Sequence, residues 1–433
     1  MKRSTLVRQT LFLSGSHFVV RVLGFVMRIW LSRSLGAATM GLVELAHSAQ
    51  MLLITPVVSG LPAAVSRMCA KSSGSAAKQT SVLRCGIGLA LLIGVPLCLL
   101  AFLFREAIAL WLGDIRTLPS LTVYLPCIPI LGVSCALNGF FYGKGRPVPP
   151  ALSELLEQII RFVLSMKLVS ALKDLPLPMR AAIPAAGTLA GETIGLFLML
   201  LCVPALFHAE QAGSRRAIVR ELLALSLPLT GMRLVSSLMR TVTASLIPAR
   251  LQLAGLPQGE ALSQLGMLNG MLMPMLLLPS FVTGSLCMVA APELTRRQAK
   301  GLPMRVLCLR IGSATLGIGL LSAAGIFTLA QFIAGSLYAQ PSLLPVLRIC
   351  SPLIPVMALS QVAGGMMNGL GLQGASLRIS LLSSLVNVLL TYLLAANPSL
   401  QLRGVLIAMA ASQLITLFFS LIALKQTISL HSE

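Results

Sequence analysis

Long apolar stretches alternate with short polar loops along the whole of this chain. Twelve of these stretches reach or exceed the roughly 20 residues that a helix needs to cross a bilayer. They run over residues 9–32, 41–66, 85–104, 119–142, 151–171, 182–207, 222–249, 262–291, 306–333, 343–369, 375–396 and 404–424. Prolines inside several stretches predict breaks or bends at Pro56, Pro62, Pro228, Pro274, Pro279, Pro352 and Pro355. The pattern predicts an all-α, polytopic membrane protein of about twelve transmembrane helices.

The second half of the pattern repeats the first. RVLGFVMR at Arg21–Arg28 matches RLVSSLMR at Arg233–Arg240, and Asn138-Gly139 is paralleled by Asn368-Gly369. Each half holds six predicted spans, an even number, so the two repeats share one orientation about an axis along the membrane normal. We predict an N-terminal six-helix lobe, a basic cytoplasmic linker and a C-terminal six-helix lobe at residues 1–210, 211–221 and 222–433.

Composition supports a membrane location. The 433 residues are 56% hydrophobic and only 10% charged, whereas a soluble domain carries about 25% charged residues. The net charge is +21, and the loops on one predicted side hold most of the lysines and arginines. By the positive-inside rule both termini are then cytoplasmic in a multi-pass protein of the cell membrane. The same charge favours contact with anionic membrane lipids, while its division among short loops disfavours nucleic acid.

The sequence contains no recognisable pattern of catalytic or metal-binding residues. The nine cysteines are dispersed without a CxxC pair, and the four histidines form no ligand cluster. There is no Walker A loop, and the 12 acidic residues form no aspartate-rich cluster of the kind a metal-dependent glycosyltransferase uses. We therefore expect no enzyme activity, no bound metal and no cofactor.

Two polar stripes lie within apolar spans, at spacings that place their members on one helix face. They consist of Ser14, His17, Arg21, Gly24 and Arg28, and of Ser226, Thr230, Arg233, Ser237 and Arg240. Each Arg at the bilayer centre costs about 2.5–3.5 kcal/mol, a cost that marks intramembrane charge as functional. Because guanidinium groups bind phosphate oxygens in pairs, we predict that the four arginines hold an anionic head group such as a pyrophosphate. Snorkelling to the interface is the alternative, and it suits Arg28 best.

Two further groups are candidates for coupling or gating. Glu154, Glu157 and Arg161 share a face of the fifth span, and Glu44 and His47 share a face of the second. Each group could titrate and couple transport to a gradient of H+ or Na+. The alternatives are structural: Glu157 neutralises Arg161 within the helix, and Glu44 neutralises an arginine of the first span. Glu192, alone in the sixth span, is a weaker candidate.

Three blocks of sequence resemble a known family. They are RVLGFVMRIWLSRSLGAATMGLVELA from Arg21, SGLPAAVSR at Ser59–Arg67 and NGFFYGKGRPVPPALSELLEQIIRF at Asn138–Phe162. They are similar to the polysaccharide and lipid-linked-oligosaccharide flippases of the multidrug/oligosaccharidyl-lipid/polysaccharide exporter superfamily, in the branch of stage V sporulation protein B. The resemblance implies two six-helix lobes around a central cavity.

The function that this resemblance implies is translocation of an undecaprenyl-pyrophosphate-linked glycan, with the peptidoglycan precursor lipid II as one candidate. The product would serve the cell wall, the spore cortex or a surface polysaccharide, with envelope-synthesis enzymes as partners. In that picture Arg21, Arg28, Arg233 and Arg240 hold the pyrophosphate. The chain departs from the family in having twelve predicted spans, where members often have fourteen. Met27-Arg28 also stands where lipid II flippases tend to have Arg-Asp.

Two other functions remain open at this point. A multidrug or cation antiporter of the same fold would need an acidic cavity, whereas the stripes are cationic. A non-transporting scaffold in an envelope-synthesis complex would be expected to carry a soluble interaction domain, and no stretch of the chain is long and polar enough to form one.

Overall fold

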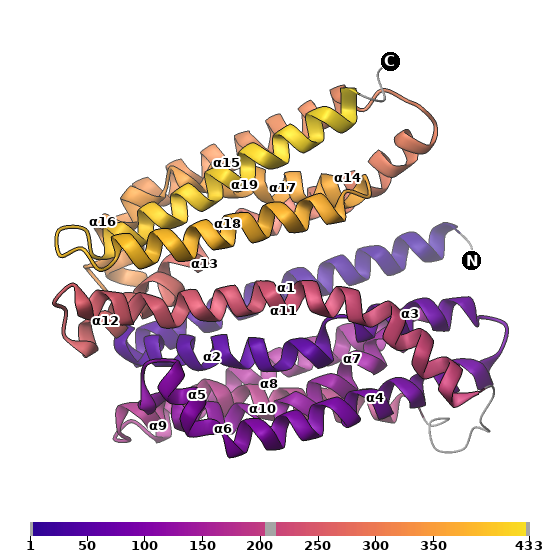
Figure 1. Ribbon diagram of the computed structural model, residues 1–433, viewed down its shortest axis with the longest axis horizontal. Coiled ribbons are helices and arrows are strands. Elements are labelled where there is room, and N and C mark those ends of the chain that lie inside the picture. The colour runs from indigo at the N-terminus through magenta and orange to yellow at the C-terminus, as the bar shows by residue number, and fades with distance from the viewer. Residues whose placement is uncertain (1–2, 204–213, 430–433) are drawn as a thin grey trace. The chain divides into compact units, whose positions relative to one another are not determined.

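The computed structural model describes residues 3–203 and 214–429, with side chains from residue 15 onward in these ranges except at positions 285, 288, 289 and 429. Over these residues the chain is helical and contains no strand (Figure 1). Each of the twelve predicted spans coincides with one long helix or with a run of shorter ones. The predicted all-α class is therefore confirmed.

The chain divides into two compact units. Unit 1 comprises Met1–Met27 and Leu42–Thr241, and unit 2 comprises Arg28–Gly41 and Val242–Glu433. Three helices pass from one unit to the other, namely α1 (Arg3–Leu35), α2 (Ala37–Val58) and α11 (Arg215–Leu253). The predicted lobe boundary at residues 211–221 stays a prediction, and positions 211–213 lie outside the described residues.

Most of unit 1 is formed by α2 and the helices that follow it. These are α3 (Leu61–Lys71), α4 (Ala76–Leu103), α5 (Arg105–Trp111), a 3-10 turn (Ile115–Thr117), α6 (Leu118–Tyr124), α7 (Cys127–Gly143), α8 (Val148–Ala171), α9 (Leu177–Ala181) and α10 (Ile183–Leu201). The break between α2 and α3 is one that the prolines predicted. Pro62 occupies the first turn of α3, where its missing N–H removes no helical hydrogen bond.

Most of unit 2 follows α11. Its elements are α12 (Gln258–Leu265), a π-helical segment (Gly266–Leu272), α13 (Met273–Leu276), α14 (Ser280–Ala299), α15 (Arg305–Phe332), a second π-helical segment (Ile333–Leu337), α16 (Leu343–Cys350), α17 (Leu353–Gly369), α18 (Gln373–Leu394) and α19 (Leu402–Ser429). Pro279 and Pro352 directly precede α14 and α17, so these two predicted breaks are also confirmed.

Not every predicted span meets a strict test of length and apolarity. Among the described residues, eight helices or helix runs are long and apolar enough to cross a membrane. They become nine if α16 and α17, which meet at 55°, form a single bent span. The other three predicted spans coincide with α1, α8 and the run from α12 to α14. A multi-pass architecture is confirmed, and the count of twelve stays a prediction.

The two units repeat the same helix pairing. In unit 1, α7 packs on α3 and α4 while α8 packs on α10; in unit 2, α17 packs on α14 and α15 while α18 packs on α19. Glycines of the repeated Asn-Gly pairs permit close helix contacts. A Cβ at Gly139 would lie 2.5 Å from the Pro62 carbonyl oxygen, and one at Gly369 would lie 2.8 Å from Cα of Ala291. The internal repeat seen in the sequence is thus a repeat of packing.

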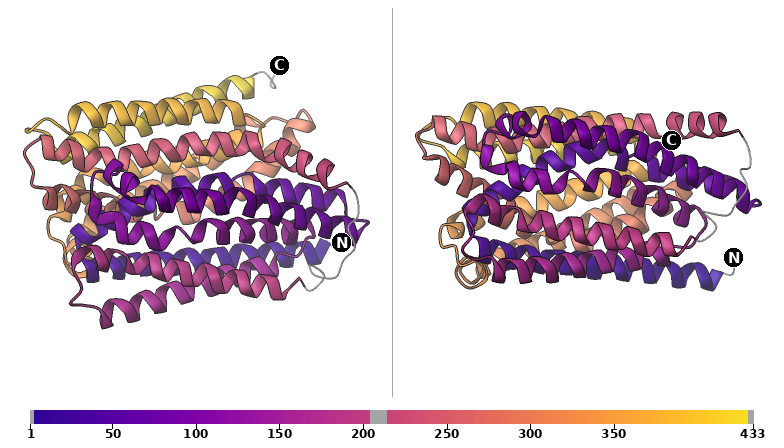
Figure 2. Two further views of the ribbon diagram at one scale, coloured as in Figure 1. Left: turned by 60° about the horizontal axis from the view of Figure 1, so that its bottom comes forward. Right: turned by 90° about the horizontal axis from the view of Figure 1, so that it is seen from below.

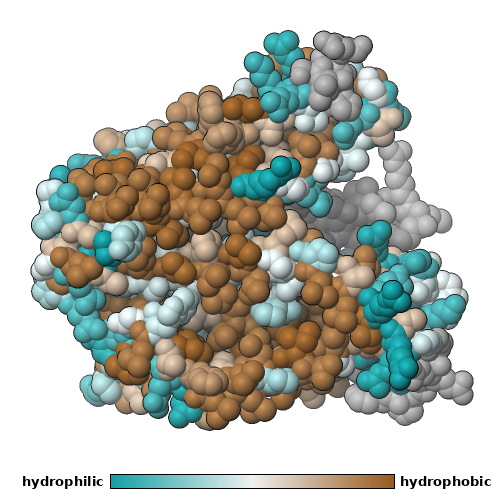
Figure 3. All heavy atoms as spheres, viewed as in Figure 1, coloured by the Kyte–Doolittle hydropathy of each residue, from teal (hydrophilic) through white to brown (hydrophobic). Residues whose placement is uncertain are grey.

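Apolar side chains cover much of the helical surface. On the face drawn in Figure 3 they dominate the middle of the helices, and hydrophilic side chains gather toward the helix ends. Leu103 and Leu321, for example, are 73% and 77% exposed. Within each unit the long helices run alongside one another in all three views (Figures 1 and 2). Exposed apolar surface on this scale is suited to lipid and not to water.

Candidate functional site

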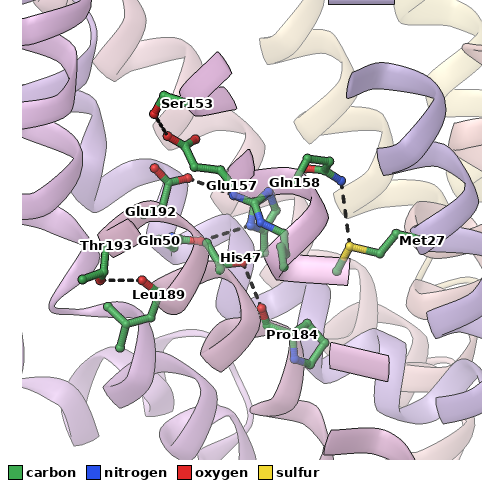
Figure 4. Close-up of polar contacts among 12 residues, drawn as sticks. Met27, His47, Gln50, Ser153, Glu157, Gln158, Pro184, Leu189, Glu192 and Thr193 are labelled. Atoms are coloured by element: carbon green, nitrogen blue, oxygen red, sulfur yellow. Dashed lines mark hydrogen bonds and ion pairs between the residues drawn. The ribbon is translucent and has the colours of Figure 1, made fainter. Parts of the chain in front are cut away.

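A cluster of ionisable side chains lies inside unit 1, where α8 packs against α10 (Figure 4). Arg161 of α8 donates from Nη2 to Oε1 of Glu192 on α10 at 2.8 Å, and the Glu192 side chain is only 10% exposed. One turn earlier on α8, Glu157 accepts a hydrogen bond from Ser153 Oγ at 2.7 Å. Gly195 of α10 makes room for this carboxylate, because a Cβ at that position would collide with Oε1 of Glu157.

The charges of this cluster do not balance. Glu157 and Glu192 converge in Figure 4, and the guanidinium of Arg161 forms an ion pair with Glu192. Two carboxylates in a largely dry site repel one another unless a cation or a proton joins them. The arrangement can therefore bind a proton or a small cation. Within residues 3–203 and 214–429, no group of three or more His, Cys, Asp or Glu side chains is placed to hold a metal ion.

The structure departs here from the simplest interpretation of the sequence. Arg161 forms its ion pair with Glu192 across two helices, and not with Glu157 along its own helix. Glu192 was only a weak candidate because no other charged residue lies near it in the sequence. The order of the spans could have identified Glu192 as a partner of Arg161. Consecutive spans joined by a short loop pack as antiparallel neighbours, so residues of the fifth and sixth spans can meet.

Glu44 and His47 lie near this cluster. His47 Nδ1 is 3.2 Å from Oε1 of Gln50, one turn along α2, and its ring centroid is 6.3 Å from that of Tyr124. Ala46 of α2 and Tyr124 of α6 pack with Ala185 of α10 in one apolar cluster. The two groups of coupling candidates, predicted from separate spans, are thus brought to the same interior of unit 1.

The first stripe packs along α8. His17 Nδ1 lies 3.0 Å from Oε2 of Glu154, so the second predicted carboxylate of α8 pairs with a member of the stripe. Further along the same face of α1, a Cβ at Gly24 would lie 3.2 Å from Nε2 of Gln158. Arg21 lies between these two contacts and its side chain is exposed. The side chain of Ser14, the first member of this stripe, lies outside the described part of the chain.

The second stripe also belongs to unit 1. Arg233 and Arg240 of α11 are exposed, whereas Ser237 between them is buried. One residue beyond Arg240, Thr241 Oγ1 donates to the Ser48 carbonyl oxygen at 2.8 Å and attaches α11 to α2. Arg21, Arg233 and Arg240 are therefore three exposed guanidinium groups of a single unit.

Arg28 differs from the other three arginines. It belongs to unit 2 and donates from Nη2 to the carbonyl oxygen of Asn269 at 2.8 Å and from Nε to that of Gly270 at 3.4 Å. Both acceptors lie in the π-helical segment Gly266–Leu272, a geometry that disturbs the regular backbone hydrogen bonds. Arg33 makes a similar contact with Ser336 in the second π-helical segment, at 2.8 Å. These contacts give Arg28 a structural role, whatever its role toward a ligand.

Replacing Arg28 with alanine is expected to destabilise the protein by about 1.5–3 kcal/mol, because two carbonyl oxygens lose a charged donor. Denaturant unfolding in detergent would measure the loss. Arg21→Ala is the matched control on the same helix, since Arg21 is exposed and its removal should leave the free energy of unfolding unchanged. Equal stability of the two variants would contradict the structural role of Arg28.

The comparison with known families decides which class of protein this is. Residues 6–298 match the family described as polysaccharide biosynthesis protein. The chain belongs to this family. It is 29% identical to stage V sporulation protein B of Bacillus subtilis (strain 168), over 96% of this chain and 82% of that protein. It is also 26% identical to the lipid II flippase MurJ of the same organism, over 37% of this chain and 31% of that protein.

Solved structures show the same fold. An inward-facing multidrug resistance transporter of the MATE family, in the MOP superfamily, superposes with a TM-score of 0.77 at 17% identity, over 96% of this chain and 99% of that one. The lipid II flippase MurJ in an inward closed conformation gives a TM-score of 0.76 at 14% identity, over 96% and 87%. These proteins are flippases and transporters. The apolar helices and this fold together make the chain a multi-pass membrane protein.

Proposed function

We propose that this protein moves an anionic lipid-linked sugar precursor, an undecaprenyl-pyrophosphate glycan such as lipid II, across the cytoplasmic membrane by alternating access. The observation that carries the proposal is the exposure of Arg21, Arg233 and Arg240 within long helices of one unit. The family and the relatives named as a stage V sporulation protein and a lipid II flippase support it. The product would serve the cell wall, the spore cortex or a surface polysaccharide.

The arginines fit a pyrophosphate for a physical reason. An arginine that is exposed within a membrane-length helix needs water or an anion beside it, because bare contact with lipid is costly. A pyrophosphate presents several oxygens, and the planar guanidinium fork binds such oxygens through two parallel hydrogen bonds. The sugar would travel through an aqueous space, while the polyprenyl tail stays in lipid.

Coupling is assigned to the cluster inside unit 1. Glu157 and Glu192 present two carboxylates to the guanidinium of Arg161, so the cluster can take up H+ or Na+ as its second positive partner. Glu44 and His47 are the neighbouring titratable pair. No cofactor is required, both termini lie in the cytoplasm in this proposal, and envelope-synthesis enzymes are the expected partners.

A multidrug or cation antiporter of the same fold is the second candidate, because a MATE transporter has a similar structure. An antiporter of cationic drugs needs an anionic surface to hold its substrate. The exposed stripe residues of unit 1 are cationic instead, so this function ranks below the first.

The test is transport by the purified protein in proteoliposomes that contain a fluorescent undecaprenyl-pyrophosphate glycan. An impermeant quencher reports how much of the lipid remains in the outer leaflet. The proposal expects protein-dependent exchange between leaflets. Export of a cationic dye without movement of the glycan would favour the antiporter, and movement of neither would favour a scaffold.

A further inference from the structure

Unit 2 carries a groove that the proposed function does not use. It has a volume of about 650 Å³ and lies where α15, α17 and α19 meet, three helices that lie together in Figure 1. Leucines and other apolar side chains line most of its length, among them Leu309 and Leu316 of α15, Leu359 of α17 and Leu421 of α19. A groove with this lining favours a hydrocarbon chain.

One end of the groove is cationic. Arg305, the first residue of α15, and Lys425, near the end of α19, are the two charged residues among those that border it. Their sequence neighbours Met304 and Leu424 pack in one apolar cluster, so the two cations lie at the same end. Apolar lining and paired positive charge match an anionic head group that is joined to a hydrocarbon chain.

No described carboxylate neutralises these cations. Unit 2 contains two described acidic residues, Glu260 of α12 and Glu293 of α14. Glu293 is bound by Arg296 and Arg297, each at 3.0 Å. Within the described residues Arg305 and Lys425 have no ion pair, so both side chains can bind an anionic ligand. A phosphate group is such a ligand, because it accepts hydrogen bonds from both kinds of side chain.

The length of the groove fits one leaflet. From Arg305 to Leu316 the helix rises about 16 Å at roughly 1.5 Å per residue. That is about half of the ~30 Å hydrocarbon thickness of a bilayer. A lipid whose head lies at the two cations would therefore place its tail along the groove and end near the midplane.

We propose that this groove binds an anionic glycerophospholipid of the phosphatidylglycerol type from the cytoplasmic leaflet, with its phosphate between Arg305 and Lys425 and one acyl chain along α15. The charge bias of the loops puts both cations on the cytoplasmic side, where anionic lipids attract basic residues. The groove shares no lining residue with the stripes or the carboxylate cluster.

Native mass spectrometry of the full-length protein in detergent tests this site. Phosphatidylglycerol and phosphatidylethanolamine with identical acyl chains would be titrated in turn. We expect the wild type to prefer phosphatidylglycerol, and Arg305→Ala/Lys425→Ala to bind it about 30-fold more weakly. The matched control is Arg310→Ala/Arg378→Ala, which removes two exposed arginines of unit 2 that do not border the groove.

A second variant keeps both cations and fills the groove. Gly312 borders it and has open space around the position of a Cβ, so Gly312→Leu should weaken phosphatidylglycerol binding without lowering the free energy of unfolding. Equal binding of the two lipids by the wild type would overturn the proposal, as would an equal loss in the arginine control. Displacement of phosphatidylglycerol by undecaprenyl phosphate at equal concentration would also overturn it, because the groove would then hold a polyprenyl tail.

Discussion

Replacing Arg21 and Arg233 with alanine is expected to abolish movement of the lipid-linked precursor while the protein still folds and inserts. The side chains are exposed, so their removal leaves no buried partner unsatisfied. The pyrophosphate, however, loses its charged donors, and each such hydrogen bond is worth about 1.5–3 kcal/mol. Two losses together predict a fall of more than about 100-fold in affinity for the head group.

The leaflet-exchange assay measures transport, and thermal unfolding in detergent measures folding of the same preparations. Arg220→Ala is the matched control, because Arg220 is also exposed on α11 but lies at its start, outside the apolar part of the helix. Transport should survive in the control. Full transport in Arg21→Ala and in Arg233→Ala would remove the pyrophosphate role from the stripes, even if the protein proved to be a flippase.

The fold could be predicted because the bilayer around a membrane protein dictates its pattern of apolar residues. In a bilayer every spanning backbone group must be satisfied within its own helix, so apolar length alone locates the helices. Prolines located breaks for an equally local reason, as at Pro62 before the body of α3. The spans that miss the strict test carry charge or are interrupted: α1 holds the first stripe, and α8 holds Glu157 and Arg161. Charge alone does not decide the test, because α11 holds the second stripe and passes it.

The candidate site was only partly predictable. Helical spacing accounts for a contact within one helix, such as that of Ser153 with Glu157 one turn away. It could not supply partners on other helices, so the pairs Arg161–Glu192 and His17–Glu154 were missed. A period of 3.6 residues fixes which face a residue lies on, and it does not fix which helix that face meets.

Arg28 also shows that helical spacing does not identify the partner of a residue. Its spacing with Arg21 is regular, yet the two residues fall in different compact units. Its acceptors, Asn269 and Gly270, become available in a π-helical segment that no sequence periodicity announces. Equal spacing in the sequence therefore does not establish equal roles.

Replacing Arg161 with methionine is expected to destabilise the protein by about 3–5 kcal/mol, the usual cost of breaking a buried ion pair on one side. The change leaves Glu157 and Glu192 facing one another without a cation, and their repulsion adds to the desolvation of Glu192. Glu192→Met should cost less, because Arg161 can turn to Glu157, one helical turn away on α8. Denaturant unfolding in detergent compares the two variants.

The double variant Arg161→Met/Glu192→Met is expected to recover most of the lost stability, since apolar side chains of similar size replace both charges. Lys71→Met is the surface control. Its partner Glu221 lies at 3.2 Å, the Lys71 side chain is 75% exposed, and its loss should cost less than about 1 kcal/mol. If the double variant is as unstable as Arg161→Met, the pair is not what stabilises this interior. If instead stability returns but transport does not, the buried charges serve coupling, because the two methionines already restore the packing.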